Sequence, residues 1–343
     1  MQECVLAVDG GNTKTIALVA ALDGTILGTG RAGCGDIYNA DRRDRAKAID
    51  VAFSNIEHAV MTALMASHAV PTDLVAGVFG MAGADWPEDF TVLHAGMSAR
   101  GFGRTILIQN DALGVLHAGT TRNVGVSLVC GTGSATGARG PDGQVWHSSF
   151  WQFGAEGGIQ LADKMLEAVF CADLGIAPTT TLTNCVLKYF GLNTVEEVLH
   201  YLTAREQTIL KHHVIGGLTP MLLDEAKVGD GVALNIVQGH GRALGRIAQV
   251  AARRVGIEGT AFPLVLAGGV LRHPSSLLPD AITEQLRTTS PEVQPVRSRF
   301  EPVIGVLFSA LEEAGVTIND TVIERVTSTI PDAALFESIP IRD

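Results

Sequence analysis

Short runs of hydrophobic residues that end in glycine recur along the chain, and each run predicts a buried strand. The first, Val5–Val8, is followed by Asp9, two glycines and a second apolar run, Thr15–Ala20. Asp23-Gly24 then gives a hairpin-turn signal before a further apolar segment. The pattern predicts strand, glycine turn and strand. It excludes the Walker A loop and the dinucleotide fingerprint, because a helix follows the glycines in both.

A second copy of this pattern lies downstream. Val124–Cys130 is an apolar run, Gly131–Ser134 is a turn of glycine and hydroxyl residues, and Ala135–Ala138 predicts the returning strand. Asp142-Gly143 then repeats the hairpin turn. Two units with the same order of strand, glycine turn, strand and Asp-Gly turn indicate an internal duplication.

The two glycine turns are candidate phosphate sites. A residue without a Cβ lets backbone amides approach an anion closely, and Asn12, Thr13 and Lys14 add side-chain donors. Two turns of this kind could bind a polyphosphate from both sides. The candidate phosphate-binding residues are Gly10, Gly11, Asn12, Thr13, Lys14, Gly131, Thr132 and Gly133.

Two further predicted strands are followed by polar residues that are candidates for ligand binding or catalysis. Leu74–Phe79 leads into the small residues Gly80–Ala84 and then Asp85, and Thr105–Gln109 leads into Asn110-Asp111. Ligands of open α/β sheets bind at the carboxyl ends of strands, which favours a chemical role for Asp111. The same residue is equally suited to cap the helix that follows it.

Helical periodicity separates the predicted strands. Apolar stripes predict helices over Asp41–His68, Glu156–Phe170, Asp230–Val255 and Phe300–Ala314, and the last residues predict an irregular tail. Strands that alternate with helices indicate an α/β fold.

The composition favours a protein with two α/β domains and argues against nucleic-acid and membrane partners. A chain of 343 residues is long enough for two domains, and 46% hydrophobic residues suit large α/β cores. The formal charge of −11 argues against a nucleic-acid or membrane partner. No apolar stretch predicts a signal peptide or a membrane span. The five cysteines are scattered and odd in number, which indicates reduced thiols in a cytoplasmic protein.

The motifs DGGNTKT and CGTGSAT resemble the two phosphate hairpins of the actin–hexokinase–heat-shock-protein ATPase superfamily. Within it, the chain resembles the BadF/BadG/BcrA/BcrD family, which includes N-acetylglucosamine kinases. Five stretches follow the family's order, namely Asp9–Thr15, Gly80–Gly83, Asn110–Ala112, Gly131–Ser134 and Ala267–Val270. The resemblance implies two actin-like (ribonuclease H-like) ATPase domains with nucleotide in the cleft between them. It places one lobe at residues 1–117, rejoined by residues from about 300 to 343, and the other, with a helical insertion, at 118–299.

The resemblance also implies an ATP-dependent sugar kinase that uses Mg²⁺. The γ-phosphoryl group would pass to a hydroxyl of an amino sugar, N-acetylglucosamine or glucosamine. Asp111 would be the general base, because a carboxylate can accept the hydroxyl proton during transfer. Asp9 would position Mg²⁺ through water, and Gly268 and Gly269 would contact adenosine. The residues implied to contact the sugar are Asp36, Asn39, Asp85, Asp111, Ser134, Trp151 and Glu156.

Several of these residues have structural alternatives. Asp36 and Asn39 lie in a loop that is equally suited to cap the next helix. Trp151 is either an apolar face for a sugar ring or a core residue, and Gly268-Gly269 is either an adenosine contact or a packing turn.

One tetrapeptide departs from the family pattern. The related kinases have glycine–aspartate–glutamate–glycine where this chain has Gly154-Ala155-Glu156-Gly157. Ala155 thus replaces an aspartate that would bind sugar hydroxyls. This difference leaves the identity of the sugar open.

The expected partner is a small-molecule sugar, with a homodimer as the assembly considered. A rival function is an ATP-hydrolysing redox activator of the same family. Leu128 stands where that group's iron–sulfur ligand is expected, and Cys130 directly precedes the glycine turn. A four-thiolate cluster needs more ligands than one cysteine per chain. A regulatory ATPase without kinase activity is the third alternative, which Ala155 keeps open.

Overall fold

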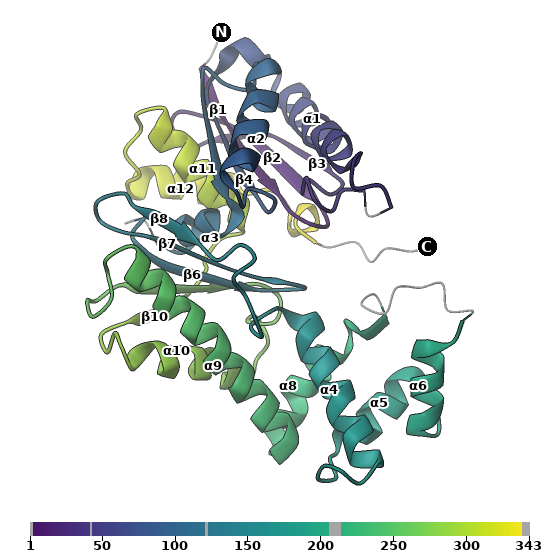
Figure 1. The fold of residues 1–343 in the computed structure, drawn as a ribbon. Coiled ribbons are helices and arrows are strands. Elements are labelled where there is room, and N and C mark those ends of the chain that lie inside the picture. The colour runs from purple at the N-terminus through teal and green to yellow at the C-terminus, as the bar shows by residue number, and fades with distance from the viewer. Residues whose placement is uncertain (1–2, 42, 121–122, 206–213, 338–343) are drawn as a thin grey trace. The chain divides into compact units, whose positions relative to one another are not determined.

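The computed structural model describes residues 3–41, 43–120, 123–205 and 214–337, and it contains two five-stranded sheets accompanied by helices (Figure 1). The chain forms two compact units. Met1–Ser127, Gly137–His147 and Arg297–Asp343 make up the first, and Leu128–Thr136 with Ser148–Val296 make up the second. The sequence predicts a first lobe of residues 1–117 and about 300–343. The first unit of the structure extends further, to Ser127, and also includes Gly137–His147.

The first sheet has the strand order β3-β2-β1-β4-β5. Its strands are β1 (Cys4–Gly10), β2 (Thr15–Ala21), β3 (Ile26–Ala32), β4 (Leu74–Met81) and β5 (Thr105–Asn110). The predicted hairpin is confirmed, since β1 and β2 are antiparallel, while β4 and β5 run parallel to β1. Gly10, Met81 and Asn110 lie opposite one another on neighbouring strands. This register brings the residues that follow β1, β4 and β5 to one edge of the sheet.

Helices cover both faces of the first sheet (Figure 1). They are α1 (Ala48–Ser67), α2 (Pro87–Ala99), α3 (Asp111–Gly119), α11 (Pro302–Glu313) and α12 (Asp320–Thr329), with 3₁₀ turns at Pro71–Asp73 and Ala333–Leu335. Alternate residues of β1 point to opposite faces. Leu6 and Val8 therefore share a core with α1, whereas Val5 and Ala7 share one with α11 and α12.

The first long helix begins later than its hydrophobic pattern predicts. It starts at Ala48 rather than Asp41. The Asp41 carboxylate accepts hydrogen bonds from the amides of Arg43 and Asp44 at 2.9 and 3.0 Å, and the Asp44 side chain accepts one from Ala46 at 3.1 Å. Such local bonds compete with helix formation, so a run of turns precedes the helix.

The hydrophobic pattern predicts no helix after Phe300–Ala314, but α12 lies between that helix and the irregular residues Ile330-Pro331. Asn319 caps this helix by accepting a hydrogen bond from Val322 N at 3.1 Å. Val322 and Val326 are buried and join the core formed with α11. Two buried positions in ten residues give a weak periodic signal, which explains why the sequence pattern did not reveal this helix.

The second sheet has the order β10-β9-β6-β7-β8. Its strands are β6 (Gly125–Cys130), β7 (Ser134–Arg139), β8 (Val145–His147), β9 (Pro263–Ala267) and β10 (Gln294–Arg297). Read from the hairpin side, β8-β7-β6-β9-β10 repeats the order β3-β2-β1-β4-β5 strand for strand. The duplication predicted from the glycine turns is therefore confirmed at the level of topology.

The second unit carries the long helical part of the chain. Its helices are α4 (Gly158–Asp173), α5 (Leu182–Phe190), α6 (Val195–Thr203), α8 (Leu218–Val228), α9 (Gly231–Arg254) and α10 (Leu277–Arg287). The predicted helix Asp230–Val255 is confirmed as α9, with Asp230 capping Ala233 N at 2.8 Å. The helix predicted from Glu156 starts at Gly158, because Gly157 has extended backbone angles.

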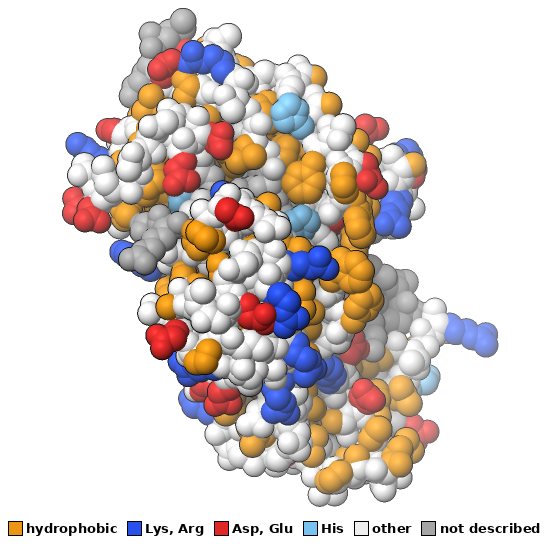
Figure 2. Space-filling model, turned by 60° about the vertical axis from the view of Figure 1, so that its left-hand side comes forward, with side chains coloured by type: hydrophobic (Ala, Val, Ile, Leu, Met, Phe, Trp, Pro, Cys, Tyr) orange, Lys and Arg blue, Asp and Glu red, His pale blue; other side chains and the backbone are white. Residues whose placement is uncertain are grey.

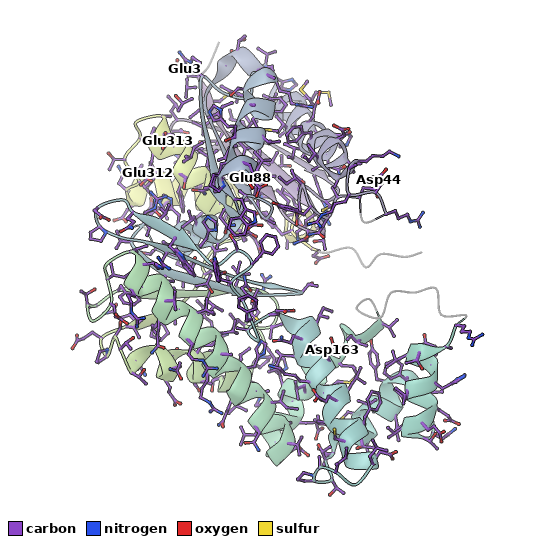
Figure 3. All side chains as sticks on the ribbon, viewed as in Figure 1. Glu3, Asp44, Glu88, Asp163, Glu312 and Glu313 are labelled. Carbon is purple, nitrogen blue, oxygen red and sulfur yellow. The ribbon has the colours of Figure 1, made fainter. Side chains whose placement is uncertain are left out.

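Charged side chains lie mainly on the surface. Glu88 is exposed in the first turn of α2, where an acidic residue interacts favourably with the helix dipole (Figure 3). Lys and Arg side chains gather on the lower half of the face in Figure 2. Within the described residues, no helix is long and apolar enough to cross a membrane.

Candidate active site

The first glycine turn is a tight loop braced from two sides. Gly11 N donates to Lys14 O at 2.9 Å and closes the turn between β1 and β2. Gly35 N donates to Gly11 O at 3.0 Å, and Ala82 N donates to Gly10 O at 2.9 Å. The loops that follow β3 and β4 thus hold the turn in place, while Asn12 and Thr13 at its tip are exposed.

The second glycine turn is braced in a similar way within the second unit. Gly131 N donates to Gly133 O at 2.8 Å, and Gly158 N at the start of α4 donates to Gly131 O at 2.7 Å. Val270 N, in the loop after β9, donates to Cys130 O at 3.0 Å. Thr132 is exposed at the tip, as its counterparts are in the first turn.

Four glycines of the candidate site have no steric reason in the described protein to be glycine. A Cβ added at Gly131, Gly133 or Gly269 would meet no described atom within 4 Å, and one at Gly11 would meet only Lys14 O at 3.4 Å. None of the four has a left-handed φ. Glycine at such positions is expected where a ligand must approach the backbone, as at a phosphate site.

Gly10 and Gly268 of the candidate site are more closely packed, and of the two Gly268 requires glycine, because the atoms near Gly10 belong to the movable end of a side chain. Gly268 has φ +101°, and a Cβ there would lie 2.3 Å from Cys130 O. A Cβ at Gly10 would lie 2.3 Å from the end of the Met81 side chain. Of the adenosine pair, Gly268 is therefore a packing residue, and Gly269 keeps an open backbone.

Asp9 and Asp111 form an acidic pair at the edge of the first sheet. Burial raises the pKa of Asp9 to about 7, the Asp111 carboxylate adds to the rise, and Lys14 opposes it. Burial also raises the pKa of Asp111 to about 6, with the Ala112 amide opposing and Asp36 adding to the rise. Asp9, Asp36, Asp111 and Lys14 therefore interact electrostatically within one region.

The cap of α3 is Asn110 and not Asp111. Asn110 Oδ1 accepts from Ala112 N at 3.2 Å, and its Nδ2 donates to Ala84 O at 3.1 Å and to Asp85 Oδ1 at 3.4 Å. Asp111 is the first residue of the helix, at the positive end of its dipole. The prediction that Asp111 is the N-cap was wrong, although backbone amides of the first turn also bond to its carboxylate.

The loop after β3 builds its own hydrogen-bond network. The Asp36 side chain is 3% exposed and accepts from Tyr38 N at 2.8 Å and from Asn39 Nδ2 at 2.7 Å. Tyr38 Oη donates to the Asp89 carboxylate at 2.9 Å, and Asp89 accepts from Trp86 N at 2.8 Å. Asp36 and Asn39 thus hold the loop, and Asn39 remains exposed. Their contact with a sugar stays a prediction.

Lys14 has a contact that the sequence does not suggest. Its Nζ donates to the backbone carbonyl of Phe336. Arg31 on β3 donates to Ala334 O at 3.2 Å, Leu335 O at 2.9 Å and Glu337 O at 2.6 Å. Two cations thereby hold the segment 334–337 against the first hairpin. Backbone carbonyls have no sequence signature, so no pattern could have predicted this contact.

The expected sugar loop packs on the second glycine turn. Ser134 Oγ donates to Ala155 O at 2.6 Å and also bonds to the Gln152 side chain. Ala155 is 1% exposed, whereas Glu156 and Trp151 are exposed, Trp151 by 57%. Trp151 is therefore not a core residue. The Ala155 side chain is buried, and its role in sugar binding stays a prediction.

A buried histidine on another element bonds to the backbone of this loop. The sequence did not predict this contact. His240 on α9 donates from Nε2 to Glu156 O at 2.7 Å, and Lys164 Nζ donates to His240 Nδ1 at 3.2 Å. Burial lowers the pKa of His240 to about 4, with Lys164 adding to the fall. The neutral ring can therefore donate to Glu156 and accept from Lys164 at once.

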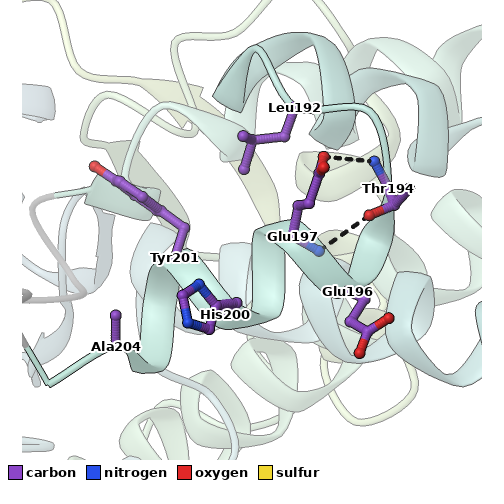
Figure 4. Close-up of a pocket in the computed structure, with 7 residues that line it drawn as sticks. All are labelled: Leu192, Thr194, Glu196, Glu197, His200, Tyr201 and Ala204. Atoms are coloured by element: carbon purple, nitrogen blue, oxygen red, sulfur yellow. Dashed lines mark hydrogen bonds between the residues drawn. The ribbon is translucent and has the colours of Figure 1, made fainter.

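A hollow in the second unit contains none of the expected site residues. It measures about 830 Å³ and is lined by Leu192, Thr194, Glu196, Glu197, His200, Tyr201 and Ala204 (Figure 4). Thr194 and Glu197 already bond to each other in the capping box of α6, at 3.1 and 3.2 Å. This hollow therefore gives no support to the expected site.

Comparison with known proteins gives the family. The BadF/BadG/BcrA/BcrD ATPase family matches residues 6–310. An N-acetylmuramic acid/N-acetylglucosamine kinase of Clostridium acetobutylicum is 24% identical over 312 residues, which cover 90% of this chain and 98% of that protein.

Solved structures share the fold. One is a candidate N-acetylglucosamine kinase from Chromobacterium violaceum, with TM-score 0.63, 21% identity, and coverage of 90% of this chain and 99% of that one. Another is a ROK family glucokinase from Streptomyces griseus, with TM-score 0.55, 18% identity, and coverage of 90% and 98%. The match along most of the sequence places the chain in the BadF/BadG/BcrA/BcrD ATPase family.

Proposed function

We propose that the protein is an ATP-dependent kinase that phosphorylates a hydroxyl of an amino sugar, with N-acetylglucosamine or glucosamine as the first candidates. The observation that carries the proposal is the pair of braced glycine turns. Their open glycines leave room for a polyphosphate, and no packing in the described protein requires glycine there. Membership of an ATPase family and a curated relative that is a sugar kinase support it.

Asp111 is the proposed general base. With a pKa of about 6 it is ionised above neutral pH, yet it holds a proton more readily than an ordinary aspartate. It can therefore accept the proton of the sugar hydroxyl as the phosphoryl group is transferred. Because Asn110 is the N-cap of α3, Asp111 is not required as the cap.

The phosphates are proposed to bind at Thr13, Lys14, Thr132 and Gly133. Lys14 would exchange the Phe336 carbonyl for a phosphate oxygen, which is a stronger acceptor because it is charged. Gly269 would present its backbone to the adenosine. The remaining candidates for sugar contacts are Asp36, Asn39, Asp85, Ser134, Trp151 and Glu156.

Mg²⁺ fits the acidic edge of the first sheet. A bound cation would neutralise phosphate charge during transfer. Asp9 would hold it through water, since Mg²⁺ retains part of its hydration shell. The raised pKa of Asp9 fits this role, because a cation nearby would favour the carboxylate that burial disfavours.

The redox alternative has little support. Cys130 is fully buried, and burial raises the pKa of its thiol to about 12. A thiol that resists ionisation and lies inside the protein is a poor cluster ligand. Among the described residues there is no group of His, Cys, Asp and Glu suited to a directly bound metal ion.

The test is a panel of acceptors with ADP release coupled to a reporter. N-acetylglucosamine, glucosamine, N-acetylmuramic acid and glucose should be compared at saturating MgATP, with phosphorylated product verified by mass spectrometry. Product from an amino sugar and little from glucose is expected. ADP release that no acceptor stimulates would instead favour a regulatory or activating ATPase.

A further inference from the structure

Three aromatic side chains are exposed within one short loop. Phe150, Trp151 and Phe153 are 54%, 57% and 81% exposed. They lie in residues 148–154, here called the aromatic loop. Aromatic residues make up only 5% of the chain, so three of them exposed within four positions form an unusual apolar surface. Exposed apolar clusters of this kind mark binding sites.

The aromatic loop is held firmly despite this exposure. Gln152 Nε2 donates to Ser148 Oγ at 2.8 Å, and Ser148 Oγ accepts from Thr136 N at 3.0 Å. Ser134 Oγ bonds to the other end of the Gln152 side chain. Gln152 therefore points inward and is bonded at both ends, while the aromatic residues on either side of it remain outside.

The loop backbone is shaped to present these rings. Ser149 has φ +43° and Gly154 has φ +70°, so a left-handed residue flanks the aromatic positions at each end. A left-handed serine is strained, and strain of this kind concentrates at ligand-binding positions. The anchors Ser134 and Thr136 belong to the second glycine turn and the strand that follows it. If that turn binds phosphate, the aromatic loop borders the place of the acceptor.

The arrangement of the rings defines the ligand. Trp151 and Phe153 have centroids 6.3 Å apart and planes at 81°. A single pyranose ring is roughly flat and can stack on only one of two perpendicular rings. The loop residues 148–154 contain no charged side chain, which suits a neutral ligand. Two perpendicular faces and a lack of charge fit a ligand with two linked rings.

We propose that the aromatic loop binds a second pyranose ring of the acceptor, so that the preferred acceptor is a neutral disaccharide of amino sugars rather than the free monosaccharide. This inference rests on the proposed kinase function and specifies its substrate class. The ring placed for phosphorylation would stack on Trp151, and the next ring would stack on Phe153.

The experiment compares kcat/KM for N-acetylglucosamine and N,N′-diacetylchitobiose in the wild type, Phe153→Ala and Trp151→Ala. We expect the wild type to prefer the disaccharide by about tenfold or more, the size of effect that burying one aromatic face can give. Phe153→Ala should remove most of that preference. Leu174→Ala is the matched control, because Leu174 is 74% exposed at the end of α4 in the same unit.

A binding measurement tests the second-ring site separately from the proposed kinase function. The disaccharide should change the intrinsic fluorescence of the wild type, and Trp151→Phe should lose most of this change, although Trp86 and Trp146 remain. Turnover with equal preference for both sugars, unaffected by Phe153→Ala, would overturn the second-ring site and leave the kinase proposal standing. A lack of turnover on any sugar, with no fluorescence change, would overturn both.

Discussion

In the structure the cap of α3 is Asn110, and Asp111 remains the proposed general base. From the sequence, Asp111 is a candidate for both roles. The Asp111 carboxylate has a pKa that is raised to about 6. Asp111→Asn should therefore lower kcat by roughly 10²-fold or more, because the base is lost. Its Tm at pH 8 should not fall, because the raised pKa means that folding disfavours the charged form of Asp111. Steady-state kinetics and calorimetry on the same preparation provide the check.

The neighbouring position is the control for this prediction. Asn110→Ala removes the cap and should cost about 1 kcal/mol of stability. In the wild type, kcat should fall as the pH drops through about 6, since protonated Asp111 cannot accept a proton. An active Asp111→Asn enzyme that merely melts earlier would show that the residue is structural.

Asp9 should make the protein less stable as the pH rises. Its pKa is raised to about 7 in the folded state, so folding favours the protonated form. The stabilisation from that proton is complete below pH 4, the range in which an unfolded aspartate titrates, and it is lost as the pH rises through 7. Asp9→Asn should avoid this loss. Its Tm, measured with EDTA, should exceed that of the wild type by several degrees at pH 8.

The pH trend is the decisive part of this prediction. The advantage of Asp9→Asn should shrink as the pH falls from 8 to 5, because wild-type Asp9 then regains its proton. An advantage that is the same at pH 5 and pH 8 would mean that the Asp9 side chain acts through packing and not through its charge.

The open glycines allow a test of phosphate binding that leaves the fold intact. Gly11→Val and Gly133→Val should each lower ATP affinity by at least roughly tenfold, because a side chain would fill space that the phosphates need. Titration calorimetry gives the affinity. Gly239→Val is the control, since Gly239 also faces open space but lies in α9. Unchanged affinity in both hairpin variants would remove the phosphate interpretation.

At the scale of elements, the glycine hairpins were predictable and several helix starts were not. A hairpin is encoded by adjacent residues, such as the apolar run, Asp9 and the two glycines. The start of α1 depends on side chains that bond to nearby amides, such as Asp41 and Asp44. The helix α12 depends on a core made with strands distant in sequence. Local patterns contain no information about such distant partners.

The candidate site shows the same limit. The positions of Asp9, Lys14 and Asp111 follow from strand ends, so sequence could place them near one edge. The roles of His240 and Gln152 depend on contacts between elements that sequence does not align, such as α9 with the loop before α4. The burial of Ala155 likewise could not be read from a motif that matches at its other three positions.

The segment that Lys14 and Arg31 hold should weaken ATP binding. In the proposed kinase, phosphate would have to displace the Phe336 carbonyl from Lys14. Deleting residues 331–343 should therefore tighten ATP binding by up to about tenfold, the effect of one hydrogen bond to a charged group. Arg31→Ala should have part of this effect, because it releases three carbonyls of the segment. Weaker binding by the shortened chain would show that the segment instead positions Lys14.

At the scale of the whole molecule, the two sheets share one strand topology but differ in the segments that follow their strands. The strand orders correspond one to one, and both copies have a glycine turn after their first strand. Their later loops differ. The strand β5 leads into Asn110 and Asp111, whereas the residues after β10 lead into α11. The acidic residue proposed for catalysis is therefore present in one copy only.

The first unit is assembled from distant parts of the chain, and this has a consequence for biosynthesis. Val5, Ala7, Leu18 and Val78 of the first sheet are buried by α11 and α12. At about 5–20 residues per second, a ribosome needs roughly 10–40 s to proceed from the end of β5 to the end of α11. During that time the nascent sheet has one apolar face uncovered. The growing chain should therefore be a client of the chaperones that shield hydrophobic surfaces on newly made proteins, until its last helices emerge.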